Sequence, residues 1–263
     1  MDLISVIIPY YKNKNFIKQT VNSVINQTYT KIEIIIVYDN ETFDELNYIK
    51  KIKDKDSRIK LIINKKNIGA GKSRNKAIKI SKGSFIAFLD ADDIWEKKKL
   101  EIQLNVMKKN NYHVTHTSYK ILNTNNKIIG QRHARNFKSI DSLIKSCDIG
   151  LSTVVIKKSI IKENNNFSKI KTKEDFVFWL KLLSRNINIY GIDVCLVKWR
   201  KLNNSLSSSK VQKIKDGFTV YNKYLKMNII KSIYYLFLLS VNSIVKKINY
   251  ILFFFFFFFK YFF

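Results

Sequence analysis

Acidic side chains follow the apolar residues 85–89 directly, at Asp90, Asp92 and Asp93. Three carboxylates this close repel one another unless a cation joins them. Carboxylate oxygens at this spacing suit Mg²⁺ or Mn²⁺, which often share their coordination with substrate phosphates. Helix capping is the alternative, since Asp92 or Asp93 could cap a helix that begins near Trp95. The cluster therefore indicates either a metal site or a helix start.

Other polar side chains stand where apolar segments end. Asp39 could accept the imide N–H of a uracil ring, or it could be a turn residue. Tyr11 could stack on a base or ribose, whereas packing is favoured for Tyr10. Arg74, near an expected helix start, could donate to a diphosphate or form a surface salt bridge. These residues make a nucleotide site one candidate interpretation.

Two acids open a later helical segment, at Glu174 and Asp175, ahead of Trp179. Such a carboxylate could be a catalytic base, or only a favourable charge at a helix start. Residues 69–73 are similar to part of a phosphate-binding loop, but Lys66 stands where that motif requires its first glycine. The sequence therefore argues against a nucleoside triphosphatase.

Short apolar segments alternate with helical patterns in the first half, which predicts βαβ units and a mostly parallel sheet. The expected strands cover residues 3–8, 32–37, 59–63 and 85–89, and Pro9 ends the first. Ligands of such sheets bind beyond the carboxyl ends of the strands, where the polar residues above lie. The second half is less regular, with strands expected at 112–119, 127–130, 152–156 and 187–197. Helices are expected at 140–147, at 174–183 with one apolar side, and from 211 onward.

Composition restricts the function less than the motifs do. The 263 residues carry a formal net charge of +28, which attracts nucleic acid, anionic membranes or phosphorylated substrates. An AT-rich coding bias explains much of that charge equally well. The lysine runs 50–51 and 97–99 lack interleaved aromatics and are typical of solvated faces. The histidines at 113, 116 and 133 form no metal set, and the two cysteines at 147 and 195 are expected to be reduced and buried.

The two ends of the chain carry different expectations. The N-terminus has no basic and apolar leader pattern, so a secretory signal is not expected. Residues 253–259 are all phenylalanine, a run shorter than the roughly 20 residues that a spanning helix needs. This run could dip into a membrane interface, helped by Lys246, Lys247 and Lys260, or it could have no function.

The ordered set of motifs resembles glycosyltransferase family 2. The resemblance lies in residues 5–11, 23–29, 33–37, 67–69, 73–78, 82–83 and 87–95, in the family's order and at its usual separations. It is close over about residues 3–107 and continues more weakly through 152–154 and 174–176 to about residue 205. One departure follows the second strand, where the family usually has two acids and this chain has Asp39-Asn40-Glu41.

This resemblance implies a GT-A fold, which is α/β with a Rossmann-like nucleotide-binding half and a mixed sheet. It implies a metal-dependent, inverting transfer of a sugar from a nucleoside diphosphate sugar, with uridine as the expected base. Asp39 would contact the base, Asp90 the ribose or metal region, and Asp92 the Mg²⁺ or Mn²⁺. Asp175 would deprotonate the acceptor hydroxyl. The remaining substrate contacts are expected at Pro9, Tyr11, Arg74, Ala91, Glu174 and Trp179.

The C-terminal residues, including Arg200, residues 204–207 and residues 221–225, resemble the tails of bacterial enzymes of this family that build capsule or lipopolysaccharide. The implied acceptor is a glycan or lipid-linked saccharide. The implied location is the inner face of the cytoplasmic membrane, with peripheral contact through the tail and no nucleic acid partner. We expect a glycosyltransferase domain over 1–205, divided at 107/108, then a helical extension over 206–249 and a phenylalanine-rich tail over 250–263.

Two other functions remain open from the residues alone. A nucleotidyltransferase also combines a nucleotide-binding α/β domain with metal carboxylates, but its glycine-rich loop after the first strand is absent from residues 9–13. A non-catalytic basic protein that binds nucleic acid or membrane is motivated by the charge of +28.

Overall fold

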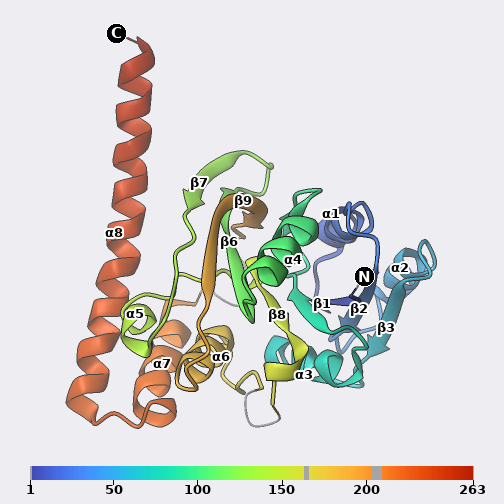
Figure 1. Cartoon of the computed structure of the whole chain (residues 1–263), viewed down its shortest axis with the longest axis horizontal. Helices are drawn as coiled ribbons and strands as arrows, with labels where there is room; N and C mark the ends of the chain where they lie inside the picture. Colours follow the sequence, from blue (N-terminus) through green and yellow to red (C-terminus); the bar gives the residue numbers. More distant parts are fainter. Residues whose placement is uncertain (1, 163–165, 203–208, 263) are drawn as a thin grey trace.

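Four parallel strands form one side of a large mixed sheet in the computed structural model, which describes residues 2–162, 166–202 and 209–262 (Figure 1). Every residue of the second strand is buried, as expected for a parallel strand covered on both faces. The strands lie in the order β3-β2-β1-β4, and they are β1 (Ile4–Tyr10), β2 (Ile32–Tyr38), β3 (Ile59–Ile63) and β4 (Phe85–Phe88).

Helices cover both faces of this parallel half. Alternate residues of β1 divide between two core clusters, because successive side chains of a strand point to opposite faces. Val6 and Ile8 pack with α1 (Lys14–Ile25) and α2 (Leu46–Lys53), whereas Ile7 packs with α3 (Ala70–Ile80). The carboxyl ends of the strands therefore lie at the edge between these two helical layers.

An antiparallel half continues the same sheet. β4 pairs with β8 (Val155–Lys157), which pairs with β6 (Val114–Leu122), and β6 also pairs in parallel with β9 (Tyr190–Arg200). Two short strands complete it, β5 (Ile94–Trp95) on β9 and β7 (Ile128–Arg132) on β6. The helix α4 (Lys99–Lys109) packs against β6 and β9, and the expected division at 107/108 falls near its end. Because one sheet runs through both halves, it fixes their relative positions.

The C-terminal helices gather beside the antiparallel half (Figure 1). They are α5 (Ile140–Ile144), α6 (Glu174–Leu183), α7 (Lys210–Thr219), a π-helical turn (Val220–Tyr224) and α8 (Ile229–Phe262). Eight of the ten residues of α6 are buried, so it is a core helix rather than the one-sided helix expected. The first part of α8 packs on α7, where the Cδ1 of Leu236 lies 2.8 Å from the position a Cβ at Gly217 would take. The rest of α8 projects away from the body.

Within the described residues, no helix is long and apolar enough to cross a membrane. The phenylalanine run at 253–259 lies within α8. The expected domain boundary at 205/206 and the motif at 204–207 fall outside the described residues.

Several expectations about the elements need correction. β1 continues through Pro9, which pairs with Val37 of β2, instead of ending before it. Proline is tolerated there because its missing N–H faces the side where β4 has already ended. Residues 151–153 form a 3₁₀ turn before β8, so the strand expected at 152–156 begins later. Both cysteines are reduced as expected, but they are half-buried.

Candidate active site

The loop between β3 and α3 is held against the end of β2 by Asp39. This carboxylate is 2% exposed and accepts hydrogen bonds from the Asn64 side chain and from the backbone N–H groups of Ile68 and Gly69, each at 2.9 Å. Gly69 has φ +87°, a conformation that favours glycine, and it precedes the first residue of α3. Asp39 therefore shapes the loop at the strand ends, where its expected contact with a base remains a prediction.

Arg74 joins the two halves of the molecule. Its side chain is 4% exposed, and its two terminal nitrogens donate to Asp90 Oδ1 at 2.7 Å and to Glu174 Oε1 at 2.8 Å. Burial alone would lower the pKa of Arg74, but the two carboxylates outweigh burial and the pKa is raised. Since 100 residues separate Arg74 from Glu174, this ion pair fixes α6 beside the end of β4. It is not the surface salt bridge considered above.

The three acids after β4 have separate environments. Asp90 is about one third exposed, with 33% side-chain exposure, and pairs with Arg74. Asp92 is half-buried, and burial, followed by the charge of Asp90, raises its pKa to about 7. Asp93 is fully buried, and burial, followed by the charges of Asp92 and Asp90, raises its pKa well above the ordinary value. Only Asp90 and Asp92 of these three are open to a ligand.

Asp93 is not a helix cap, because residues 94–95 form β5 and α4 begins at Lys99. Its carboxylate instead accepts from the hydroxyl of Ser152 and from the backbone N–H of Arg200 at 2.8 Å. Ser152 also accepts from the N–H of Asp90 at 3.0 Å, and the Arg200 guanidinium donates to the Asp92 carbonyl at 3.0 Å. Ser152 and Arg200 therefore hold the acidic segment in place from the antiparallel half.

Sequence reasoning missed these two supporting residues. Arg200 stands 107 residues after Asp93, and no spacing rule connects a residue on one strand to an acid on a distant loop. Ser152 lies in a segment that resembled the family only weakly. The one available signal was that a buried acid in Asp90–Asp93 would need donors from elsewhere in the fold.

The residues present fit a divalent cation only as part of a ligand set. The residues that the structure describes contain no group of three or more His, Cys, Asp or Glu side chains that could hold a metal ion. Asp90 and Asp92 repel each other and are partly exposed, an arrangement that a cation would stabilise. Mg²⁺ commonly binds through one or two carboxylates together with substrate phosphates, so these two acids fit such a site.

The acids at the start of α6 face the same region. Glu174 is buried against Arg74, and burial raises its pKa to about 7, opposed by the charge of Arg74. Asp175 is half-buried and accepts from the N–H of Phe176 at 2.7 Å. Burial raises the pKa of Asp175, while the charges of Lys173 and Arg74 lower it and that of Asp90 raises it. These interactions place Asp175 within electrostatic range of the acids after β4.

The remaining expected substrate contacts have different positions. Tyr11 is 40% exposed just beyond β1, so it can meet a ligand at the strand ends. Pro9 is half-buried within β1, and Ala91 is buried, with its carbonyl accepting from Thr20 Oγ1 at 3.0 Å. Trp179 has no exposed surface and lies in the core. Its position supports a packing role beneath the site and offers no surface to a substrate.

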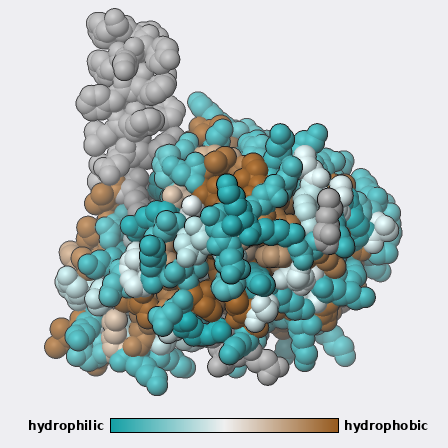
Figure 2. Space-filling model, viewed as in Figure 1, coloured by the Kyte–Doolittle hydropathy of each residue, from teal (hydrophilic) through white to brown (hydrophobic). Residues whose placement is uncertain are grey.

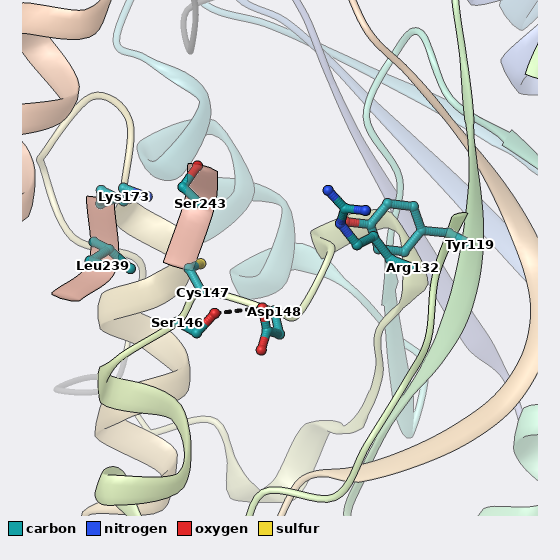
Figure 3. A pocket seen from close by; sticks show the side chains of 8 residues that line it. All are labelled: Tyr119, Arg132, Ser146, Cys147, Asp148, Lys173, Leu239 and Ser243. Carbon is teal, nitrogen blue, oxygen red and sulfur yellow. Dashed lines mark hydrogen bonds between the residues drawn. The ribbon is translucent and has the colours of Figure 1, made fainter. Parts of the chain in front are cut away.

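A pocket lies between α8 and the β6–β7 hairpin (Figure 3). Figure 3 shows Arg132 and Tyr119 on one side, Cys147 and its neighbours in the middle, and Lys173 with residues of α8 on the other side. Tyr119 lies within electrostatic range of Asp175 and Asp93, whose charges raise its pKa after the larger effect of burial. The pocket therefore adjoins the acids. It is lined by Tyr119, Arg132, Ser146, Cys147, Asp148, Lys173, Leu239 and Ser243.

Comparison with known proteins places this arrangement among glycosyltransferases. The family model described as "Glycosyl transferase family 2" matches residues 5–187. The chain is 38% identical over 237 residues to WfgD of Escherichia coli, a UDP-Glc:alpha-D-GlcNAc-diphosphoundecaprenol beta-1,3-glucosyltransferase, covering 89% of this chain and 90% of WfgD. It is 32% identical over 247 residues to TuaG of Bacillus subtilis (strain 168), a glycosyltransferase assigned to teichuronic acid biosynthesis, covering 94% and 98% of the two chains.

The solved structures agree on the fold. The structure of TarS residues 1–349 from S. aureus in complex with UDP-GlcNAc superposes with a TM-score of 0.70 and 24% identity, covering 90% of this chain and 70% of that one. The curled mixed sheet with a helical C-terminal region confirms the expected GT-A fold.

Proposed function

This chain belongs to glycosyltransferase family 2, and from that premise we propose that it transfers a sugar from a UDP-sugar to a hydroxyl of a lipid-diphosphate-linked saccharide, with inversion. The observation that carries the proposal is the convergence of Asp90, Asp92, Glu174 and Asp175 around Arg74 at the carboxyl ends of the parallel strands. The similarity to WfgD over most of both chains supports UDP-glucose as a donor type and a diphospho-lipid acceptor. The similarity to TuaG supports a role in surface polysaccharide biosynthesis.

The donor nucleotide binds where β1, β2 and β4 end. Tyr11 is exposed there for stacking on the base or ribose, and Pro9 and Ala91 form the adjoining backbone. Asp39 contacts the base from the loop that it holds, since a carboxylate that accepts three hydrogen bonds keeps a further acceptor position. Asp90 reaches the ribose or the metal region through its exposed side.

Asp92, with Asp90 beside it, would hold a Mg²⁺ or Mn²⁺ ion next to the donor's diphosphate. A bound ion would supply positive charge against the charge that develops on the leaving diphosphate. Arg74 adds positive charge near the leaving diphosphate. Its ion pair with Glu174 fixes the direction of the Arg74 guanidinium. Glu174 is therefore a positioning residue.

Asp175 is the catalytic base. Its pKa is raised by burial, which makes the carboxylate a better proton acceptor than an exposed aspartate. It takes the proton from the acceptor hydroxyl as that oxygen forms a bond to the anomeric carbon. The bond from this carbon to the diphosphate oxygen breaks on the opposite face, UDP leaves with the electron pair, and the anomeric configuration inverts.

Peripheral contact with the inner face of the cytoplasmic membrane is part of the proposal. α8 exposes apolar side chains at helical spacing on one face, including Ile230 at 80%, Phe237 at 62% and Ile244 at 56%. Figure 2 shows hydrophobic side chains along the edge of the molecule where the first part of α8 lies in Figure 1. Lys223, Lys226 and Lys231 are exposed at the same end and suit an anionic lipid surface.

A donor panel tests the function. UDP-, GDP-, CDP- and TDP-sugars are incubated with the purified protein, a lipid-diphosphate-linked saccharide and Mg²⁺ or Mn²⁺, and release of the nucleoside diphosphate is measured. We expect a UDP-sugar to be turned over and Asp92→Asn to reduce that rate by about 100-fold or more, because charge on the leaving group is no longer stabilised. Asp44→Asn, at an exposed position, is the matched control and should leave the rate unchanged.

Turnover of no UDP-sugar would refute the proposed donor. Equal rates for wild type and Asp92→Asn would refute the metal role while leaving the donor assignment standing.

A further inference from the structure

The pocket in Figure 3 contains two cationic side chains that have no acidic partner within the described residues. Arg132 on β7 donates to the carbonyl of Gln131 at 3.1 Å and forms no salt bridge with any residue that the structure describes. Lys173, which precedes α6, likewise has no carboxylate within salt-bridge distance there. Both line one pocket, from opposite sides in Figure 3.

Asp148 is the one acid among the described residues that line the pocket, and its negative charge is balanced by a salt bridge. Asp148 pairs with Arg135 at 2.8 Å and accepts from the Ser146 hydroxyl at 2.8 Å. Among the side chains that line the pocket, the positive charges of Arg132 and Lys173 are therefore in excess. Charge of this kind in a partly enclosed space favours an anion with several oxygen acceptors.

The pocket lies close to Asp175, the proposed catalytic base. Lys173 precedes Asp175 by two residues, and its charge acts on that carboxylate. Tyr119 pairs with Arg132 across the β6–β7 hairpin, and the charge of Asp175 contributes, after burial, to raising the pKa of Tyr119. An anion bound here would sit beside Asp175 and outside the donor site at the ends of β1, β2 and β4.

We propose that this pocket is the subsite for the diphosphate of the lipid-linked acceptor, with Arg132 and Lys173 as its phosphate-binding residues. The proposal rests on the proposed function and adds how the acceptor is recognised. Leu239 of α8 supplies an apolar wall, and α8 carries exposed apolar side chains on its other face. The lipid part of the acceptor therefore has an apolar route from the pocket toward the membrane.

The kinetic test compares two acceptors that carry the same saccharide. One is linked to a lipid diphosphate, and the other is an uncharged alkyl glycoside with a chain of equal length. We expect Arg132→Gln to raise KM for the diphosphate acceptor on the order of ten-fold, because charge-assisted hydrogen bonds to phosphate are lost. KM for the uncharged acceptor, KM for the donor and kcat should stay within about two-fold, and Arg132→Lys should recover part of the loss.

Lys127→Gln is the matched control, since Lys127 is an exposed cation in the turn of the same hairpin. It should leave both acceptors unaffected. Equal losses of Arg132→Gln on both acceptors would show an effect on catalysis or folding and would overturn the subsite. An unchanged KM for the diphosphate acceptor would overturn it as well.

A binding test is independent of turnover. Inorganic pyrophosphate is titrated calorimetrically into the full chain with UDP at saturation, so that the donor site is filled. We expect Arg132→Gln and Lys173→Gln each to weaken binding on the order of ten-fold, and Lys127→Gln to leave it unchanged. Equal binding by all variants would refute the subsite, even if sugar transfer had been demonstrated. Absence of transfer with intact pyrophosphate binding would refute the proposed function and keep the subsite.

A vesicle-binding experiment with phosphatidylglycerol distinguishes two possible ligands of the pocket, the acceptor diphosphate and an ordinary lipid headgroup. We expect Arg132→Gln to bind these vesicles as the wild type does. Loss of vesicle binding together with an unchanged KM for the diphosphate acceptor would instead identify the pocket as a headgroup site and overturn the proposal.

Discussion

At the scale of single residues, burial decides which acids can do chemistry. Asp90, Asp92 and Asp93 are neighbours in sequence, yet Asp93 is fully buried and tied to Ser152 and Arg200. Asp92 is partly exposed beside the charge of Asp90. An aspartate therefore supports the fold at position 93, whereas the adjacent aspartate at position 92 is a candidate metal ligand.

Replacing the proposed base should separate transfer from binding. Asp175→Asn keeps the shape of the side chain but removes the proton acceptor. We expect the rate of sugar transfer to fall by about 100- to 10,000-fold, as for loss of a general base. Binding of UDP, measured by calorimetry, should stay within about two-fold of the wild type.

Asp141→Asn is the control for this variant, because Asp141 is an exposed acid in the first turn of α5 and so shares only the helix-start position. It should transfer sugar normally. Normal transfer by Asp175→Asn would remove Asp175 from the mechanism and leave its charge as a favourable interaction with the start of α6.

At the scale of elements, α4 begins with a lysine that has no access to water. Lys99 is fully buried, its Nζ donates to Gln103 Oε1 at 2.6 Å, and it lies 4.0 Å from the centre of the Trp95 ring. Burial lowers the pKa of Lys99 well below the ordinary value of 10.5. The expectation that the lysine run at 97–99 forms a solvated face is therefore wrong for Lys99, since only Lys97 and Lys98 are exposed.

This buried lysine makes stability depend on pH. Between the lowered pKa of the folded protein and 10.5, the unfolded chain holds more protons than the folded one, so stability rises with pH. We expect Lys99→Met to flatten that rise by up to about 1.4 kcal/mol per pH unit. The measurement is the free energy of unfolding in urea from about pH 7 to about pH 9.

Lys98→Met is the matched control, because Lys98 is the exposed neighbour of the buried Lys99. Its pH dependence should follow the wild type. If Lys99→Met did so too, the buried amine would not be charged differently in the folded and unfolded proteins.

The sequence predicts the parallel half well because its information is local. β2 and β3 of the parallel half, and α6 outside it, lie at or within one residue of their expected bounds, since apolar periodicity and the acids at the segment ends are contained in each segment. β5 was missed because two residues carry no periodicity, and its strand geometry comes from pairing with β9. The partners of Asp93 and the burial of Lys99 depend on contacts between distant segments, which periodicity cannot specify.

At the scale of the whole molecule, the proposed membrane contact through α8 would orient the protein relative to a membrane. We expect the full chain to bind vesicles that contain anionic lipid, and Ile230→Ser with Phe237→Ser to weaken that binding on the order of ten-fold, because apolar burial in the interface is lost. Co-sedimentation with vesicles measures it, and transfer to a water-soluble acceptor should be unchanged.

Val211→Ser is the control, since Val211 is 78% exposed on α7 rather than on the exposed face of α8. It should bind vesicles normally. Undiminished binding by the double variant would refute this face as the membrane contact and would leave general charge attraction as the cause.

The hydrogen bonds from Arg200 to the segment of Asp92 and Asp93 also set the order in which the protein matures on the ribosome. Arg200 follows Asp93 by 107 residues, so at roughly 5–20 residues per second several seconds of synthesis separate them. During that interval the nascent chain has the parallel strands but lacks β9, and the carboxylate of Asp93 lacks its backbone donor. A messenger truncated before this strand would yield a product that already holds the four parallel strands but lacks the donors that complete the hydrogen bonding of Asp92 and Asp93.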